Sequence, residues 1–81
     1  FFTIMSKTAI ELKIIEIVRE RRKANQLSQA KLAKVLNVTP GYIGQIEMDD
    51  SPSMYSYYQL NELAKYFECS PRDFFPENPV I

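Results

Sequence analysis

Histidine is missing from this chain of 81 residues, and cysteine occurs only once. Histidine is the commonest general acid or base, and clusters of histidine and cysteine hold most protein-bound zinc. No glycine-rich loop that would surround a phosphate is present either. The carboxylate pair Asp49 and Asp50 lies among serines and a proline and is better explained as part of a loop. We therefore expect no enzyme, no metal and no cofactor, and no small-molecule ligand is apparent.

The single cysteine, Cys69, excludes an internal disulfide and predicts a reduced, cytoplasmic compartment. We expect Cys69 to be a small buried apolar residue and not a reactive thiol. No apolar run approaches the roughly 20 residues that cross a bilayer, so we expect a soluble chain with no membrane partner. Because no methionine precedes Phe1, we take Met5 as the native start and leave open whether residues 1–4 are native.

Positive charge is not in excess, because 10 Lys and Arg balance 10 Asp and Glu. The distribution is uneven, however. Residues 19–34 carry six basic residues and one acidic residue, a net +5, whereas residues 35–81 carry two basic and seven acidic residues, a net −5. The folded molecule should therefore be polarised, although a solvated helix face would have the same pattern. The basic residues of the first segment are Arg19, Arg21, Arg22, Lys23, Lys31 and Lys34.

Residues 29–46, with the sequence QAKLAKVLNVTPGYIGQI, read as two short helices joined by a turn. Asn37 falls at the reversal and tolerates the left-handed conformation better than most residues. Thr39 followed by Pro40 is typical of a helix N-cap with proline at the first helical position. Ala33 lies where two crossing helices would approach most closely. Helices are therefore predicted over residues 29–36 and 40–47, with an apolar stripe made of Leu32, Val35, Leu36, Val38, Ile43 and Ile46.

Capping patterns place the other helices. Thr8 and Glu11 form a capping box that begins a first helix near residue 9, ending near 23 or 24. Its apolar residues exceed one stripe, which indicates two buried surfaces, the second facing the apolar residues 1–5 or another subunit. Leu27 is expected to plug the connection that follows. The apolar residues of this helix are Ile10, Ile14, Ile15, Ile17 and Val18.

Ser28 is expected to cap the second helix, and residues 48–55 read as a loop. Ser56 and Gln59 repeat the capping-box spacing and begin a fourth helix. At least one tyrosine of residues 55–58 should be in the core. A fifth, very short helix is predicted to begin at Ser70, Pro71 and Asp73 and to carry Phe74 and Phe75.

The segments LSQAKLA and GYIGQIE, with a small residue, a turn residue and a buried isoleucine at these spacings, resemble the XRE-like helix-turn-helix family of phage lambda repressor and Cro. The resemblance covers about residues 14–75. It implies an all-α, five-helix lambda-repressor-like DNA-binding domain over residues 8–76, preceded by an apolar arm at residues 1–7 and followed by a tail at residues 77–81.

In this family the second helix of the motif lies in the major groove of double-stranded DNA. Matching positions imply that Thr39, Tyr42 and Gln45 read bases, while Pro40, Gly41 and Gly44 let the backbone approach. Gln45 suits an adenine edge, and the Tyr42 hydroxyl suits a phosphate. For Lys31 and Lys34, an ordinary role as solvent-exposed surface residues is as good an explanation as phosphate binding. The phosphate-binding positions implied by the resemblance are Ser28, Gln29, Lys31, Lys34, Asn37, Tyr57 and Tyr58.

The resemblance also implies an ion pair between Arg22 and Glu47 that would fix the angle of the recognition helix, although both could instead be solvated. The chain departs from the family after Glu47, where Met48, Asp49 and Asp50 replace the usual basic residue and glycine. Two carboxylates there would repel phosphate. Either the loop turns away from DNA, or affinity is weakened, or the surface serves a protein partner.

These features together predict a sequence-specific transcriptional regulator, a repressor, that binds a palindromic operator as a homodimer. The alternative is a protein-interaction module on the same fold, such as an antitoxin or anti-repressor. The apolar arm and the face of residues 10–17 are the first candidates for a dimer interface, and residues 74–81 are the second.

Overall fold

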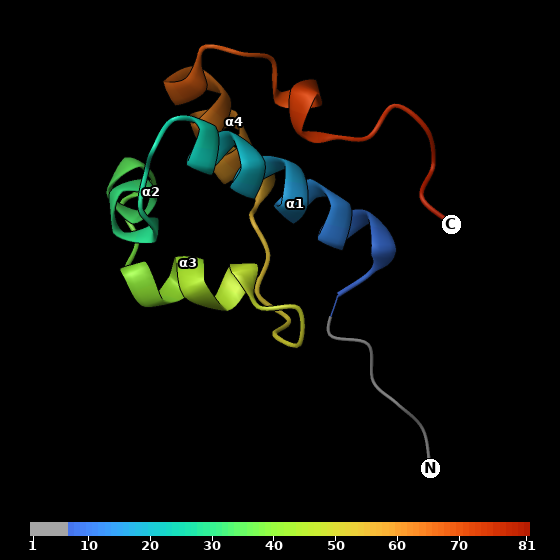
Figure 1. Ribbon diagram of the computed structural model, residues 1–81, viewed down its shortest axis with the longest axis horizontal. Helices are drawn as coiled ribbons and strands as arrows, with labels where there is room; N and C mark the ends of the chain where they lie inside the picture. The colour runs from blue at the N-terminus through green and yellow to red at the C-terminus, as the bar shows by residue number, and fades with distance from the viewer. Residues whose placement is uncertain (1–6) are drawn as a thin grey trace.

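The computed structural model describes residues 7–81, which form four α-helices and one 3₁₀ turn without any strand (Figure 1). The predicted all-α class is confirmed for these residues. The fifth element is a single 3₁₀ turn that does not include Phe75, because a residue before proline avoids the helical region. The elements are α1 (Ala9–Ala24), α2 (Gln29–Leu36), α3 (Pro40–Glu47), α4 (Tyr57–Phe67) and η1 (Pro71–Phe74).

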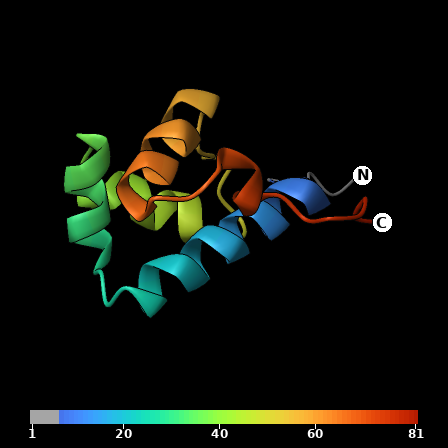
Figure 2. The ribbon, with the colours of Figure 1, turned by 90° about the horizontal axis from the view of Figure 1, so that it is seen from above.

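Helix α1 crosses the middle of the molecule and separates α3 on one side from η1 on the other (Figure 1). Helix α2 closes one end, where it packs against both α3 and α4. Seen from above, the beginning of α1 and the C-terminal tail lie together at the opposite end (Figure 2). The helix-turn-helix pair therefore forms one end and one side of the molecule, and α1 provides its support.

The expected N-caps are all present. Thr8 and Glu11 form the capping box of α1, and Ser56 and Gln59 form that of α4. The hydroxyl oxygen of Ser28 accepts a hydrogen bond from the backbone N–H of Lys31, at 3.1 Å. Each cap satisfies a backbone donor that an isolated helix end would leave unpaired, so local sequence alone is enough to begin these helices.

Within residues 7–81, three residues other than glycine adopt the left-handed conformation. Asn37 does so at φ 57°, as expected of the turn between α2 and α3. Gln26 (φ 58°) and Glu68 (φ 56°) were not anticipated, and Glu68 ends α4. Both glycines of the chain lie inside α3 instead. The helix ends at Gln26 and Glu68 are therefore set by the packing of the following residues, against the local preference of a side chain with a Cβ.

The core is continuous between α1 and the other four elements. Ile10, on the face of α1 expected to meet residues 1–5 or another subunit, is 39% exposed, and the tyrosine expected in the core is Tyr55. Burial raises the pKa of the Tyr55 hydroxyl, which has no hydrogen-bond partner among the described residues. Cys69 is half-buried against this core. The fully enclosed core residues are Val18, Leu32, Ile43, Ile46, Leu63 and Phe74.

Arg21 occupies a position of α1 that faces η1. Its guanidinium carbon lies 5.9 Å from the centre of the Phe74 ring, an arrangement that attracts the cation to the aromatic face. The aliphatic stem of an arginine can cover apolar surface while its charge remains near water. This contact explains how a charged residue is accommodated where α1 meets the C-terminal turn.

No helix within residues 7–81 is long and apolar enough to cross a membrane. Residues 1–6, which include most of the expected arm, lie outside the described part of the chain.

Replacement of Glu68 by glycine should stabilise the domain by roughly 0.5–1 kcal/mol, because glycine adopts the left-handed conformation without a Cβ penalty. Urea unfolding followed by circular dichroism measures the change. The matched variant Asn61→Gly, on the exposed face of the same helix, should lower stability, since glycine is unfavourable inside a helix. Equal destabilisation by both glycines would contradict the assignment of Glu68 as a strained cap.

Candidate nucleic-acid interface

Helix α3 presents one buried and one exposed side. Ile43 and Ile46 are fully enclosed, whereas Thr39, Pro40, Gly41 and Gln45 are exposed. Thr39 caps the helix by accepting a hydrogen bond from the backbone N–H of Tyr42, so its own hydroxyl hydrogen remains available to donate. The exposed side therefore combines a helix N-terminus, a hydroxyl and the amide of Gln45, which are groups able to donate to phosphate or to a base edge.

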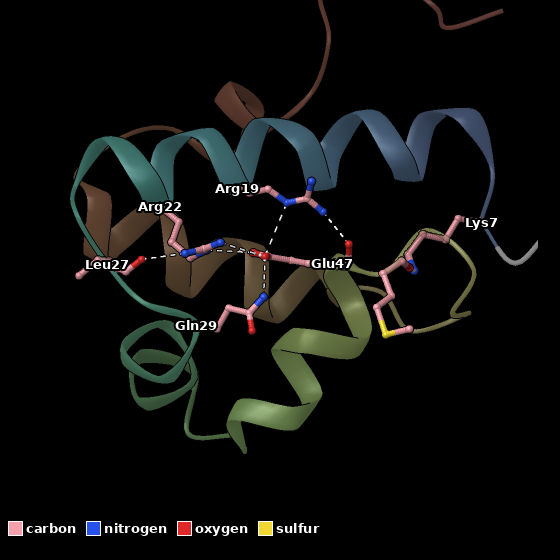
Figure 3. A network of polar contacts seen from close by, with 7 residues as sticks. Lys7, Arg19, Arg22, Leu27, Gln29 and Glu47 are labelled. Atoms are coloured by element: carbon pink, nitrogen blue, oxygen red, sulfur yellow. Dashed lines mark hydrogen bonds and ion pairs between the residues drawn. The ribbon is translucent and has the colours of Figure 1, made fainter.

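The C-terminal end of α3 is anchored by the carboxylate of Glu47, whose side chain is only 6% exposed (Figure 3). Arg22 of α1 donates from Nε to Oε2 and from Nη2 to Oε1, both at 3.0 Å. Its Nη1 also donates to the carbonyl of Leu27, at 2.8 Å. The ion pair implied by the family resemblance is thus present, and it is bidentate and buried.

Two further side chains converge on the same carboxylate. Gln29 at the beginning of α2 donates from Nε2 to Glu47 Oε1 at 2.9 Å, and Arg19 Nε lies 3.6 Å from that oxygen. Burial by itself would raise the pKa of the Glu47 carboxyl. The hydrogen bonds from Arg22 and Gln29, with the charges of Arg22 and Arg19, outweigh that effect, so its pKa lies below the ordinary value. Glu47 therefore stays ionised and joins α1, α2 and α3.

Arg19 and Lys7 support this end of α3 in a way that sequence patterns did not reveal. Arg19 donates from Nη2 to the carbonyl of Glu47 at 2.6 Å, and the Lys7 ammonium donates to the carbonyls of Met48 and Ser51. The sequence feature that points to such support is the lack of a basic residue in the last turn of α3. A helix end of that kind favours a cation from elsewhere, but sequence does not say which one.

Gln29 is positioned differently from the phosphate-binding role expected of it. Its amide N–H group is directed to Glu47, and its amide oxygen faces Gly44 of the next helix. A methyl group built on Gly44 would lie 3.7 Å from that oxygen, an ordinary contact, and one on Gly41 would meet nothing within 4 Å. Gln29 thus joins α2 to α3, and its amide N–H group is used in a contact within the domain.

The Tyr42 hydroxyl, which was expected at a phosphate, has a hydrogen-bond partner within the domain. Tyr42 is half-buried against the core, and its hydroxyl donates to the carbonyl of Met54 at 3.2 Å. This bond ties α3 to the segment that leads into α4. The ring of Tyr42 packs beside the core, and its partly buried hydroxyl is satisfied by this bond.

The remaining predicted contact residues lie at the surface. Tyr57 and Tyr58, at the beginning of α4, are 86% and 72% exposed, and Asn37 is exposed at the turn. One hollow between α2 and the beginning of α3 is lined by Ser28, Lys31, Lys34 and Pro40. The structure thereby gathers three of the expected phosphate-binding residues next to the N-terminus of α3.

Fewer basic side chains of residues 19–34 are available to a ligand than the net charge of this segment suggested. Arg19 and Arg22 bind Glu47, and Arg21 lies over Phe74. Of the six basic residues in 19–34, only the lysines at positions 23, 31 and 34 are exposed. Half of the apparent basic patch therefore holds the fold together, and the positive charge available to a ligand comes mainly from α2.

The acidic loop after α3 begins with a tight turn. The backbone N–H of Ser51 donates to the carbonyl of Met48 at 3.2 Å, which leaves Asp49 and Asp50 exposed at the tip. Asp49 lines a hollow together with Ala9, Lys13 and Arg19 of α1. Asp49 therefore borders α1 on this side of the loop. Within residues 7–81, no group of three or more possible ligands could hold a metal ion.

Comparison with known proteins places this arrangement among helix-turn-helix domains. The sequence profile of the helix-turn-helix family matches residues 18–74, more than half of the chain, while no curated protein matches it. The restriction-modification controller protein C.AhdI from Aeromonas hydrophila has a similar structure, with a TM-score of 0.66 and 30% identity, over 79% of this chain and 94% of that one.

Two other solved structures show how widely the fold is used. The P22 c2 repressor, in complex with a synthetic operator, has a TM-score of 0.64 and 29% identity, over 80% of this chain and 96% of its own. Hydroxypropylphosphonic acid epoxidase from S. wedmorenis has a TM-score of 0.72 at 21% identity, which concerns the fold alone. The match spans 86% of this chain but only 36% of the epoxidase chain.

The substitution Glu47→Gln should destabilise the domain by about 3 kcal/mol at pH 7, because it leaves buried guanidinium groups without a carboxylate. The folded pKa of Glu47 lies below its ordinary value of 4.5, so its contribution is complete above that pH and is lost as the pH falls through the folded pKa. The difference between wild type and variant, measured by urea unfolding, should therefore narrow in acid.

The control is Glu16→Gln, which removes an exposed pairing with Lys13 on α1. This variant should unfold like the wild type, since exposed ion pairs contribute little. Wild-type stability of Glu47→Gln at pH 7 would show that the buried network does not hold α3.

Proposed function

The chain belongs to the XRE-type helix-turn-helix family of DNA-binding transcriptional regulators, and we propose that it is a repressor that binds a palindromic operator as a homodimer. Two copies related by a two-fold axis would place their α3 helices in successive major grooves, roughly 10 bp apart. Occupation of the operator would then block transcription. No catalytic step is assigned to the chain.

One observation carries this proposal: Arg22 of α1 and Gln29 of α2 hold the C-terminal end of α3 through the Glu47 carboxylate, while the other side of α3 is exposed. A base-reading helix needs a fixed angle to the body of the domain, because hydrogen bonds to base edges tolerate little displacement. The similarity to the P22 c2 repressor, which is in complex with a synthetic operator, supports binding of this chain to duplex DNA.

The chemistry available on this surface assigns roles to individual residues. Gln45 can both donate to and accept from an adenine edge in the major groove, and Thr39 can donate to a phosphate or place its methyl on thymine. Gly41 leaves open space beside the helix, so a backbone or base edge can approach closely. The phosphate contacts fall to Ser28, Lys31, Lys34, Asn37, Tyr57 and Tyr58.

Selection of bound sequences from random duplex DNA would identify the operator and test binding and specificity together. On the selected duplex, Gln45→Ala should weaken binding by about 1–3 kcal/mol, roughly 5- to 150-fold, and relax the preference at one base position. Tyr42→Phe is the matched control, because its hydroxyl donates to Met54. This variant should retain DNA affinity while losing some stability.

If no duplex is selected, or if Gln45→Ala binds the selected duplex as the wild type does, the proposal that α3 reads bases is wrong. Salt-independent binding of a protein partner by the same surface would instead favour the interaction-module alternative, in which the acidic loop of residues 48–51 is the contact.

The proposed dimer concerns the end of the molecule where α1 begins. Ile10 and Phe75, 39% and 40% exposed, line one apolar hollow of about 500 Å³ that also includes Tyr57. The two candidate interfaces inferred from the sequence therefore adjoin each other. Exposed apolar surface of this kind is a common feature of contacts between protein chains.

Sedimentation equilibrium at micromolar concentration should give twice the 9.4 kDa mass of one chain. The double variant Ile10→Ser/Phe75→Ser should dissociate at least about tenfold more readily, because two apolar anchors leave the interface. The control Tyr66→Ser removes an aromatic ring that is 49% exposed elsewhere on α4 and should leave the mass unchanged. A monomeric wild type would exclude the homodimer.

A further inference from the structure

Lys7 is a buried lysine that donates to two backbone carbonyls. Its side chain is only 2% exposed, and its ammonium donates to the carbonyl of Met48 at 2.5 Å and to that of Ser51. These two carbonyls come from the loop beyond the recognition helix, more than 40 residues away in sequence (Figure 3). Burial of an ammonium group is costly unless its hydrogen bonds are satisfied, so this placement calls for a structural reason.

The two carbonyls are the two ends of one turn. The backbone N–H of Ser51 also donates to the carbonyl of Met48, so Lys7 clamps the turn of residues 48–51 from its inner side. Arg19 holds the preceding carbonyl, that of Glu47. The end of α3 has an extended C-cap and no basic residue of its own, so these two cations from outside α3 replace the missing C-terminal cap.

The clamped turn carries the exposed residues Asp49 and Asp50 at its tip, directly after the C-terminal end of α3. With the clamp in place, Asp49 lies toward α1, in the hollow lined by Lys13 and Arg19. Helix α1 lies beside α3 and contacts it (Figure 1), whereas Gly41 and Gln45 of α3 are exposed. The orientation of the turn therefore decides whether this carboxylate lies near phosphate or away from it.

We propose that Lys7 is a positioning residue for DNA binding: by clamping the turn of residues 48–51, it keeps the acidic tip away from the phosphate backbone. The inference rests on the proposed function, and it adds a residue that does not itself contact DNA. Without the clamp, the tip moves toward the docking surface, where one carboxylate near a phosphate lowers affinity by about fivefold.

The test combines loss of the clamp with loss of the acidic charges. Lys7→Met keeps the length of the side chain but removes the ammonium, and it should lower the melting temperature by about 5 °C and weaken binding to the selected duplex about fivefold. The triple variant Lys7→Met/Asp49→Asn/Asp50→Asn should recover wild-type affinity while its melting temperature stays low. Affinities are measured by fluorescence anisotropy at a temperature where circular dichroism shows every variant folded.

Two matched variants separate the clamp from simpler effects. Lys65→Met removes an exposed positive charge from α4 (68% exposed side chain) and should bind DNA as the wild type does. Ile14→Val lowers stability through the core and should also retain affinity. The pair Asp49→Asn/Asp50→Asn in the wild-type background should change affinity less than it does in the Lys7→Met background.

Failure of this inference is distinguishable from failure of the proposed function. If the wild type selects a duplex but Lys7→Met binds it equally well, or if the triple variant stays weak, the positioning role is overturned and the proposed function stands. If the wild type binds no duplex at all, both are overturned.

Discussion

The rest of the structure depends on the hydrogen bonds made by the Glu47 carboxylate. Glu47 is the last residue of α3, and its carboxylate accepts hydrogen bonds from Arg22 on α1 and Gln29 on α2. Three helices that have only short connections between them are thereby fixed at one point. Apolar packing alone resists sliding poorly, whereas a bidentate guanidinium–carboxylate pair allows only one geometry. The angle of α3 is therefore determined by a buried charge as well as by core volume.

This use of charge changes how the basic segment should be interpreted. Arg19, Arg21 and Arg22 account for half of its positive residues, and all three are engaged within the domain. Arginine suits such positions because its planar guanidinium binds a carboxylate with two hydrogen bonds and stacks on an aromatic ring. The lysines of α2 stay exposed and provide the charge beside α3. The net charge of a segment thus overstated the charge that a nucleic acid would meet.

The acidic loop after α3 is accommodated by the same principle. A helix normally ends in a left-handed residue that satisfies its last carbonyls, as α2 does at Asn37. Helix α3 instead continues into an extended residue, and Lys7 and Arg19 satisfy the carbonyls from outside. A cap supplied by a distant residue links the orientation of the loop to the beginning of the chain. In this domain, the contacts that support the end of the recognition helix also fix the position of the acidic loop that follows it.

Much of the fold was predictable because it depends on neighbours within four residues. The four α-helices begin at Thr8, Ser28, Thr39 and Ser56, whose hydroxyl groups cap the backbone directly after them. The same local chemistry explains the left-handed Asn37. The ion pair of Arg22 with Glu47 was available only through the family resemblance, since 25 residues separate its partners.

Contacts between distant residues were decided by the tertiary structure alone. The Tyr42 hydroxyl turns inward to Met54, the Gln29 amide turns to Glu47, and the Lys7 ammonium reaches Ser51, across 12, 18 and 44 residues. Each of these polar groups is chemically able to bind DNA, and its sequence position was compatible with that role or silent about it. The sequence by itself determined where each helix begins and which residues are apolar. Only the packed structure determined which polar side chains serve the scaffold, because a polar group that becomes buried must find a partner wherever the fold brings one near.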